Sequence, residues 1–264
     1  MKFEEHRHEN GVLYLTAPTI GTKHCFTTRI GGVSEDHLKG LNLGENRGDA
    51  PARVAENYRL IGEATGIDTQ HMAFTRQVHG SAVRVVGKAD VHELFTPVPY
   101  EADGIVTDVP GLTLICFTAD CVPVLLCDSA HGVCAAVHCG WRSSVADILK
   151  NAVDAMCTLG AETETIGAAI GPAISRCCFD VGGEVVAAVE RCLGGDTAGL
   201  YIAKDNGKFL LDLKAANARR LLQLGLSAEN IAVSDDCTMC KHETYWSHRY
   251  TKGERGSQAA LIAL

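Results

Sequence analysis

Short apolar runs, separated by glycine, proline and acidic residues, dominate the middle and the end of the chain. Runs of this length between turn-forming residues are typical of buried strands. Strands are predicted at 113–117, 122–126, 132–137, 166–170, 209–211, 231–233 and 259–264.

Apolar residues at helical spacing predict helices at 144–159, 183–193 and 213–224. In the first, Asp147 stands where a weak capping box places an acidic residue. Asp212 can cap the third helix and Gly225 can close it. Strands and helices interleave without strict alternation, which favours a mixed α/β layered fold over a doubly wound sheet. No linker divides the sequence, so we expect one domain over 1–264.

Composition and charge narrow the class of protein. The 264 residues are 46% hydrophobic and 21% charged, as in ordinary globular proteins, and the formal net charge is −8. An acidic protein of this kind is not expected to bind nucleic acid, although a local arginine can still bind an anionic substrate. The first ten residues lack the apolar core of a signal peptide, and no run of about 18 apolar residues occurs. We therefore expect a cytoplasmic monomer without membrane contact.

The chain contains twelve cysteines, which we expect to be reduced thiols in the cytoplasm. Cys116, Cys127, Cys134 and Cys157 lie in apolar runs and are interpreted as small core residues.

Cys237 and Cys240 form a C-x-x-C motif among polar residues. A structural zinc site requires a second pair of ligands at a suitable spacing. Cys177 and Cys178 are adjacent rather than spaced, so we interpret the C-x-x-C motif as a structural turn, with an accessory metal or redox role as the alternative.

Three clusters place a histidine or cysteine at the end of a predicted strand, namely QVHG with His79, TADC with Cys121 and VHCGWR with His138. Two imidazoles and one thiolate with an open fourth position are a known catalytic zinc set. The same residues suit a blue-copper centre. A multicopper enzyme needs several H-x-H pairs, and this chain has one, formed by His6 and His8.

Cys121 could instead be a nucleophile with His79 or His138 as its base. The neighbouring carboxylate of Asp120 is expected to raise the pKa of the Cys121 thiol, which disfavours a free thiolate and favours the metal-ligand interpretation.

Nucleotide-binding signatures are absent: the sequence has no G-x-G-x-x-G, no P-loop and no zinc-deaminase motif. Arg29 precedes Gly31 and Gly32, whose turn could bind an anion or be an ordinary hairpin.

Taken together, these motifs resemble the YfiH-like family, whose members are described both as laccase-domain polyphenol oxidases and as purine nucleoside phosphorylases. The resemblance extends over almost the whole chain. It is carried by FTTRIGGVS, GLNLG, RQVHG, ADGIVTD, TADCVPVLLCD, HCGWR, IGPAI, FDVGGEV and the segment from CTMC to YWSHR. Ser143 and the C-terminal sequence RGSQAALIAL depart from the usual pattern.

The resemblance implies a four-layer α-β-β-α sandwich with mixed sheets. It also implies a zinc ion held by His79, Cys121 and His138. The implied reactions are phosphorolysis of adenosine, inosine and methylthioadenosine, together with deamination of adenosine.

For phosphorolysis we expect Arg29 to bind phosphate, with Asn42 and Arg249 as further substrate contacts. Asp120 is the candidate acid or base, or else the partner of a zinc-bound histidine, and Cys121 and His79 act through the metal. Three alternatives stay open: a copper polyphenol oxidase, a cysteine amidohydrolase and an enzyme that edits peptidoglycan precursors.

Overall fold

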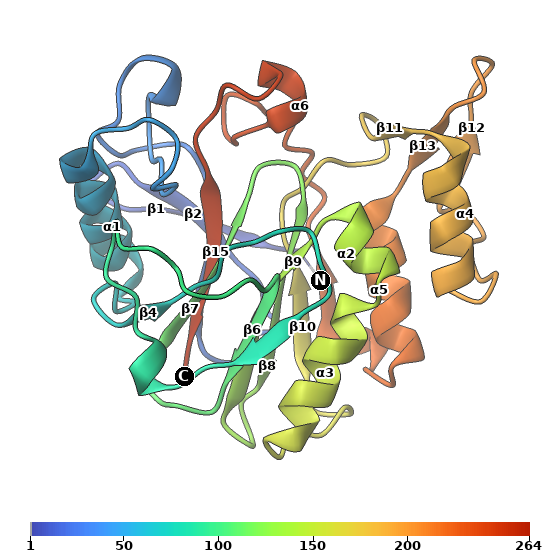
Figure 1. Cartoon of the computed structure of the whole chain (residues 1–264), viewed down its shortest axis with the longest axis horizontal. Helices are drawn as coiled ribbons and strands as arrows, with labels where there is room; N and C mark the ends of the chain where they lie inside the picture. Colours follow the sequence, from blue (N-terminus) through green and yellow to red (C-terminus); the bar gives the residue numbers. More distant parts are fainter. Residues whose placement is uncertain (1) are drawn as a thin grey trace.

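The computed structural model describes residues 2–264, which form two six-stranded sheets, a small third sheet and several helices (Figure 1). In order across the first sheet lie β1 (Glu4–Arg7), β2 (Leu13–Thr16), β3 (Lys23–Thr27), β15 (Gln258–Ala263), β7 (Thr113–Thr118) and β4 (Met72–Ala73). In order across the second lie β14 (Ile231–Val233), β10 (Gly167–Ile170), β8 (Val122–Asp128), β9 (Val133–Cys139), β6 (Gly104–Thr107) and β5 (Val83–Val85).

The principal helices cover the outer faces of these two sheets (Figure 1). They are α1 (Pro51–Thr65) on the first sheet, and α2 (Trp141–Val145), α3 (Ile148–Thr158) and α5 (Leu213–Gln223) on the second. Beyond them lie α4 (Gly183–Cys192) and the small sheet of β11 (Asp180–Val181), β13 (Phe209–Leu211) and β12 (Tyr201–Ala203). The short α6 (His248–Thr251) lies near one end of β15.

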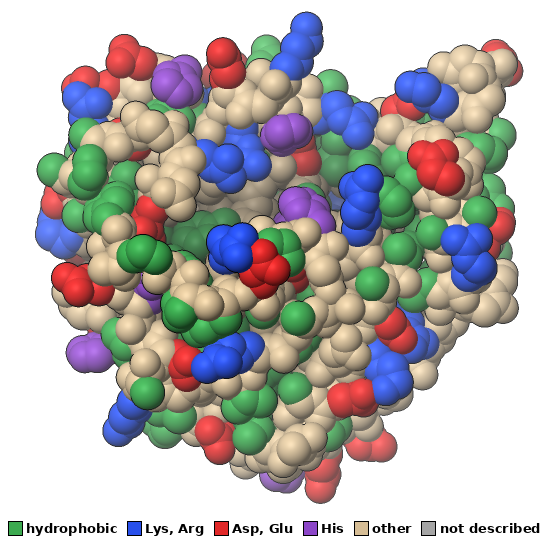
Figure 2. All heavy atoms as spheres, viewed as in Figure 1, with side chains coloured by type: hydrophobic (Ala, Val, Ile, Leu, Met, Phe, Trp, Pro, Cys, Tyr) green, Lys and Arg blue, Asp and Glu red, His purple; other side chains and the backbone are tan. Residues whose placement is uncertain are grey.

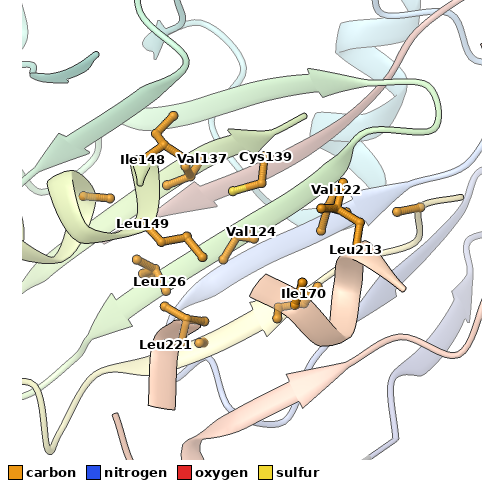
Figure 3. Close-up of a cluster of buried hydrophobic side chains, with 14 of the residues drawn as sticks. Val122, Val124, Leu126, Val137, Cys139, Ile148, Leu149, Ile170, Leu213 and Leu221 are labelled. Carbon is orange, nitrogen blue, oxygen red and sulfur yellow. The ribbon is translucent and has the colours of Figure 1, made fainter. Parts of the chain in front are cut away.

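Three buried clusters show why the sheets stack. Alternate residues of a strand face opposite sides, so each sheet contributes to two clusters. Leu114 of β7 and Leu125 of β8 pack between the sheets, Ile115 packs under α1, and Val124 packs under α3 and α5 (Figure 3). The result is the four-layer α-β-β-α sandwich with mixed sheets that the family resemblance implied.

All the predicted strands are present, but the helix predicted at 144–159 is interrupted. It is divided into α2 and α3 at Ala146 and Asp147, and Asp147 has a left-handed φ of 65°. The capping box is therefore wrong: the Asp147 side chain caps no helix and instead binds Arg220 of α5 through two hydrogen bonds of 2.7 Å.

Two further differences concern burial and the N-terminal region. Cys157, expected in the core, is exposed on α3, whereas Cys116, Cys127 and Cys134 are buried as predicted. The strands β1 to β3 and the helix α1 were not predicted from the hydrophobic pattern. None of the helices over residues 2–264 has the length and apolar character required to cross a lipid bilayer.

Candidate metal centre

His79, Cys121 and His138 converge although 59 residues separate the first from the last (138 − 79). Cys121 lies in the turn between β7 and β8, and Val122 pairs with Cys139 in the antiparallel ladder to β9, which brings Cys121 beside His138. One ligand atom from each of the three residues lies within 4.8 Å of the others. His79 Nε2 is 3.8 Å from Cys121 Sγ.

The buried carboxylate of Asp103 organises both histidines. Its Oδ1 is 2.8 Å from His138 Nδ1 and accepts a hydrogen bond from the backbone N–H of His79. Its Oδ2 accepts from the N–H groups of Val78 and Gly80. A carboxylate behind a ligating histidine fixes the tautomer and the ring orientation, so Nε2 of His138 is left to face Cys121. Sequence reasoning did not assign this role to Asp103, although its motif ADGIVTD was noted.

Gly140 leaves room for the ligands. A Cβ atom at this position would lie 2.8 Å from Cδ2 of His79 and 3.5 Å from Sγ of Cys121. The backbone of the HCGWR motif therefore has to approach the two side chains without a side chain of its own. His79 itself adopts a left-handed φ of 60°, which its backbone hydrogen bond to Asp103 stabilises.

The two histidines favour the thiolate form of Cys121. Burial alone raises the pKa of Cys121, but hydrogen bonding and charge from His138 and His79 outweigh it and lower the pKa to about 6. For His138, burial lowers the pKa, and the contacts with Asp103 and Cys121 raise it to about 9. The expectation that Asp120 would raise the pKa of Cys121 is therefore wrong, because the histidines determine it.

Both carboxylate oxygens of Asp120 are engaged by other segments of the chain, and Asp120 is not among the residues that line the cavity beside the three candidate ligands. Its Oδ1 accepts a 2.6 Å hydrogen bond from Thr238 Oγ1, and its Oδ2 accepts one of 2.6 Å from the backbone N–H of Arg249. Asp120 thus ties the turn that carries Cys121 to two later segments of the chain. The carboxylate that contacts His138 is Asp103 rather than Asp120.

The ligands open into a cavity of about 680 Å³. Figure 2 shows a face that is hollowed near its centre, where basic and histidine side chains border the recess. Apolar side chains, including Phe74, Phe95 and Phe117, form part of the cavity wall. Thr118 also lines the cavity, and its buried hydroxyl has no hydrogen-bond partner among residues 2–264.

Two arginines, which we call the arginine pair, line the same cavity. Arg47 Nε and Arg255 Nη1 both donate to the hydroxyl of Ser257, at 3.1 and 3.0 Å. Burial and the charge of Arg47 lower the pKa of Arg255 to about 10, and its buried Nε has no partner within the described chain. Two adjacent guanidinium groups in one cavity wall are a candidate site for an anion.

Glu45 is a further carboxylate in the cavity wall. Its side chain is 9% exposed, and its Oε1 lies 3.6 Å from Nε2 of the buried His92. Neither Glu45 nor the arginine pair was predicted from the sequence. Glu45 directly follows the GLNLG motif, but nothing in the local pattern indicates that Arg47 and Arg255 meet.

The predicted substrate contacts lie elsewhere. The guanidinium of Arg29 stacks on Trp246, 4.0 Å from the ring centroid, and donates to the carbonyls of Lys39 and His242. Asn42 is fully buried and binds Asp49 and backbone groups. The guanidinium of Arg249 lies 5.7 Å from the ring of Phe179. Within the described chain, none of these three lines the cavity with the arginine pair.

The chemistry of the three ligands fits a metal ion. The thiolate form of Cys121 is favoured, His138 is oriented by Asp103, and the ligand atoms are close enough to share one ion. His79, Cys121 and His138 would supply three ligands and leave further positions toward the cavity. Both zinc and copper accept such a set.

The fold and this centre define a laccase-like class of α/β protein. Residues 23–264 match the family model described as multi-copper polyphenol oxidoreductase laccase, and the chain belongs to that family. The YfiH-like resemblance inferred from the motifs is confirmed.

Curated relatives in this family have names that refer to purine chemistry. The chain is 39% identical over 254 residues to a purine nucleoside phosphorylase of Deinococcus radiodurans, covering 96% of this chain and 94% of that protein. It is 34% identical over 238 residues to adenosine deaminase RL5 from an unknown prokaryotic organism, covering 88% and 90%.

Two solved structures share the whole fold. The structure of YlmD from Geobacillus stearothermophilus has a TM-score of 0.90 at 30% identity, covering 98% of both chains. The structure of a Bacillus licheniformis hypothetical protein, YfiH, has a TM-score of 0.90 at 28% identity, also covering 98% of both chains.

Proposed function

We propose that this protein is a zinc-dependent purine nucleoside phosphorylase. Its proposed substrates are adenosine, inosine and methylthioadenosine, and adenosine deamination is a second activity of the same cavity. The observation that supports this proposal most directly is that one cavity is lined by the three candidate metal ligands and by two adjacent arginines, Arg47 and Arg255. The names of the relatives from Deinococcus radiodurans and of RL5 support the substrate class.

The cavity suits a nucleoside and a phosphate together. Phe74, Phe95 and Phe117 offer apolar and aromatic surface for a purine base, while Thr118 offers an unpaired hydroxyl. Phosphorolysis requires an anion on one face of the sugar, and the arginine pair supplies the donors for it. The role first assigned to Arg29 therefore moves to Arg47 and Arg255.

Each group of the chain has a distinct task in this proposal. The arginine pair binds and orients phosphate, and Glu45, whose Oε2 accepts a hydrogen bond from the N–H of Phe95, is the carboxylate that we assign to proton exchange with the substrate. Asp103 holds Nδ1 of His138 in a hydrogen bond, and Asp120 positions the turn that carries Cys121. His79, Cys121 and His138 would hold a zinc ion, and such an ion would supply Lewis-acid chemistry at the cavity.

Product analysis tests the proposal directly. Adenosine incubated with the zinc-loaded enzyme and phosphate should yield adenine and ribose 1-phosphate, and without phosphate it should yield only inosine. If neither adenine nor inosine forms, the purine assignment is wrong.

Phenol oxidation by copper-loaded protein would instead identify a polyphenol oxidase. Turnover that survives a chelator but not iodoacetamide would assign a cysteine hydrolase, and turnover of muropeptide precursors would assign peptidoglycan editing.

An arginine variant separates the two reactions. Arg47→Ala should raise the KM for phosphate at least about tenfold, because a lost charge-assisted hydrogen bond is worth roughly 1.5–3 kcal/mol. Deamination without phosphate should change less than about threefold. Arg59→Ala on the exposed face of α1 is the matched control. Equal loss of both reactions in Arg47→Ala would contradict the assignment of phosphate to the arginine pair.

A further inference from the structure

Four cysteines outside the metal centre form a compact group, which we call the four-cysteine cluster. One sulfur from each of Cys177, Cys178, Cys237 and Cys240 lies within 4.8 Å of the others. Cys240 Sγ is 3.4 Å from Cys178 Sγ and 3.6 Å from Cys177 Sγ. The C-x-x-C motif therefore does meet a second pair, and the expectation that Cys177 and Cys178 could not supply it is wrong.

These sulfur separations suit one tetrahedral ion. Zinc–sulfur bonds of about 2.3 Å place the sulfurs of a tetrahedral site roughly 3.8 Å apart. The separations from Cys240 lie slightly below this value, and no pair in the cluster exceeds 4.8 Å. A disulfide would need a sulfur–sulfur distance of about 2.05 Å, so the two cysteine segments are held as neighbouring thiols.

The backbone holds the two segments in register around the cluster. Ala173 pairs with Cys237 in an isolated parallel bridge, and Thr238 N donates to the carbonyl of Ala173. Ser175 N donates to Sγ of Cys237 at 3.4 Å. N–H groups of Met239 and Cys240 also face that sulfur. Backbone donors directed at a sulfur stabilise a thiolate and orient it as a ligand.

Electrostatics requires a cation if this cluster is ionised. Four thiolates within 4.8 Å of one another repel strongly, and only a bound cation compensates such a group. Four soft sulfur ligands select zinc over oxygen-preferring cations such as magnesium and calcium. The set has no open position, which distinguishes a structural zinc site from a catalytic one.

We propose that Cys177, Cys178, Cys237 and Cys240 bind a second zinc ion in a closed structural site. This site joins the segment after β10 to the segment between β14 and α6. Thr238, inside the C-x-x-C motif, donates the 2.6 Å hydrogen bond to Asp120, the neighbour of Cys121. The second zinc thus fixes a loop that supports the turn carrying a ligand of the metal centre.

Metal content distinguishes the two sites. Protein produced with zinc and purified under reducing conditions without chelator should contain about two zinc ions per chain. Cys121→Ala should retain about one, and the double variant Cys178→Ser/Cys240→Ser should also retain about one. Cys157→Ser, which removes an exposed cysteine on α3, should retain both. A Cys121→Ala protein without zinc would contradict the second site, as would a wild-type protein with iron bound there.

Cobalt binding provides an independent test of the second site, and its result does not depend on whether the double variant folds. Co²⁺ added to metal-free Cys121→Ala should produce the intense absorption of tetrahedral thiolate-bound cobalt, with a stoichiometry of about one per chain. Removing Cys240 in the same background should abolish this absorption while circular dichroism shows a folded protein. The proposal would be overturned if Cys121→Ala showed no such absorption. It would also be overturned if protein purified anaerobically under reducing conditions had a mass lower by two hydrogens, which is the mass change of a disulfide.

Discussion

At the scale of single residues, the metal centre depends on groups that never touch the cavity. Asp103 uses one oxygen for His138 and the backbone of His79, and the other for the N–H groups of Val78 and Gly80. One buried carboxylate therefore orients the ring of His138 and holds the backbone at His79. Removing its charge should weaken the centre without removing a ligand.

Asp103→Asn should lower zinc affinity at the centre by about 10–100-fold, the usual effect of losing a carboxylate behind a ligating histidine. Competition with a chromophoric chelator measures this affinity. Asp108→Asn is the control, because Asp108 is an exposed carboxylate directly after β6, whereas Asp103 directly precedes that strand. This variant should bind zinc like the wild type. Unchanged affinity in Asp103→Asn would contradict the assigned role.

Gly140→Ala tests the space that the ligands require. The added Cβ would lie 2.8 Å from the ring of His79, so that ring must move and zinc affinity should fall at least about tenfold. Gly87→Ala is the matched control, because its backbone is extended and nothing lies within 4 Å of the new Cβ. Wild-type zinc binding by Gly140→Ala would show that the ring has freedom to shift.

At the scale of elements, the break between α2 and α3 is the clearest departure from the sequence pattern. The apolar spacing over 144–159 is helical on both sides of Asp147, so periodicity alone does not reveal the break. The left-handed φ of Asp147 and its paired hydrogen bonds to Arg220 are tertiary features. They connect the start of α3 to α5.

The left-handed conformation of residue 147 predicts that glycine is more favourable than alanine at this position, which is the reverse of the usual order in a helix. Asp147→Ala should be less stable than Asp147→Gly by about 1 kcal/mol, because a Cβ is unfavourable at this φ. At the exposed position 55 in α1 the usual order should hold, with Ala55→Gly less stable than the wild type by about 0.5–1 kcal/mol. Urea denaturation measures both. An Asp147→Ala protein more stable than Asp147→Gly would contradict the helix break.

At the scale of the whole molecule, buried carboxylates hold distant loops to the sandwich. Asp128, at the end of β8, accepts hydrogen bonds from the N–H of Glu162 and the hydroxyl of Thr165, and its Oδ2 is 2.8 Å from Nδ1 of His131. Burial raises the pKa of Asp128, but these hydrogen bonds outweigh it and hold the pKa below its usual value. The ionised form therefore stabilises the folded state.

The sign of the pH dependence follows from this lowered pKa. The stabilisation is present above the unfolded pKa near 3.9 and is lost as the pH falls through the lower folded value. Asp128→Asn should cost about 1–3 kcal/mol at pH 7, and its difference from wild type should shrink below about pH 4. Denaturation at several pH values measures this. Asp205→Asn, in an exposed turn, should have the same free energy of unfolding as the wild type at every pH. A loss of stability in Asp128→Asn that does not change with pH would contradict the role of the ionised Asp128.

Local patterns predicted the strands 113–117, 122–126 and 132–137 because each has apolar residues on both faces, as the inside of a layered fold requires. The N-terminal strands and α1 were missed although VLYL at 12–15 is a short apolar run and Val54, Tyr58 and Ile61 of α1 lie at helical spacing, because polar residues surround both signals. Pairing of β15 with β3 and β7 joins the two ends of the chain, and no local signal encodes such a contact.

The sequence by itself determined the strands of the central layers and, through its motifs, the family and the three candidate metal ligands His79, Cys121 and His138. Only the tertiary structure decided which charges surround them. It brought Asp103 behind His138, bound Asp120 to Thr238, and joined Arg47 to Arg255 across more than two hundred residues. It also assembled the four-cysteine cluster from two segments. Residue types and local periodicity are properties of the chain, whereas side-chain neighbours depend on how the sheets stack and where their connecting turns meet.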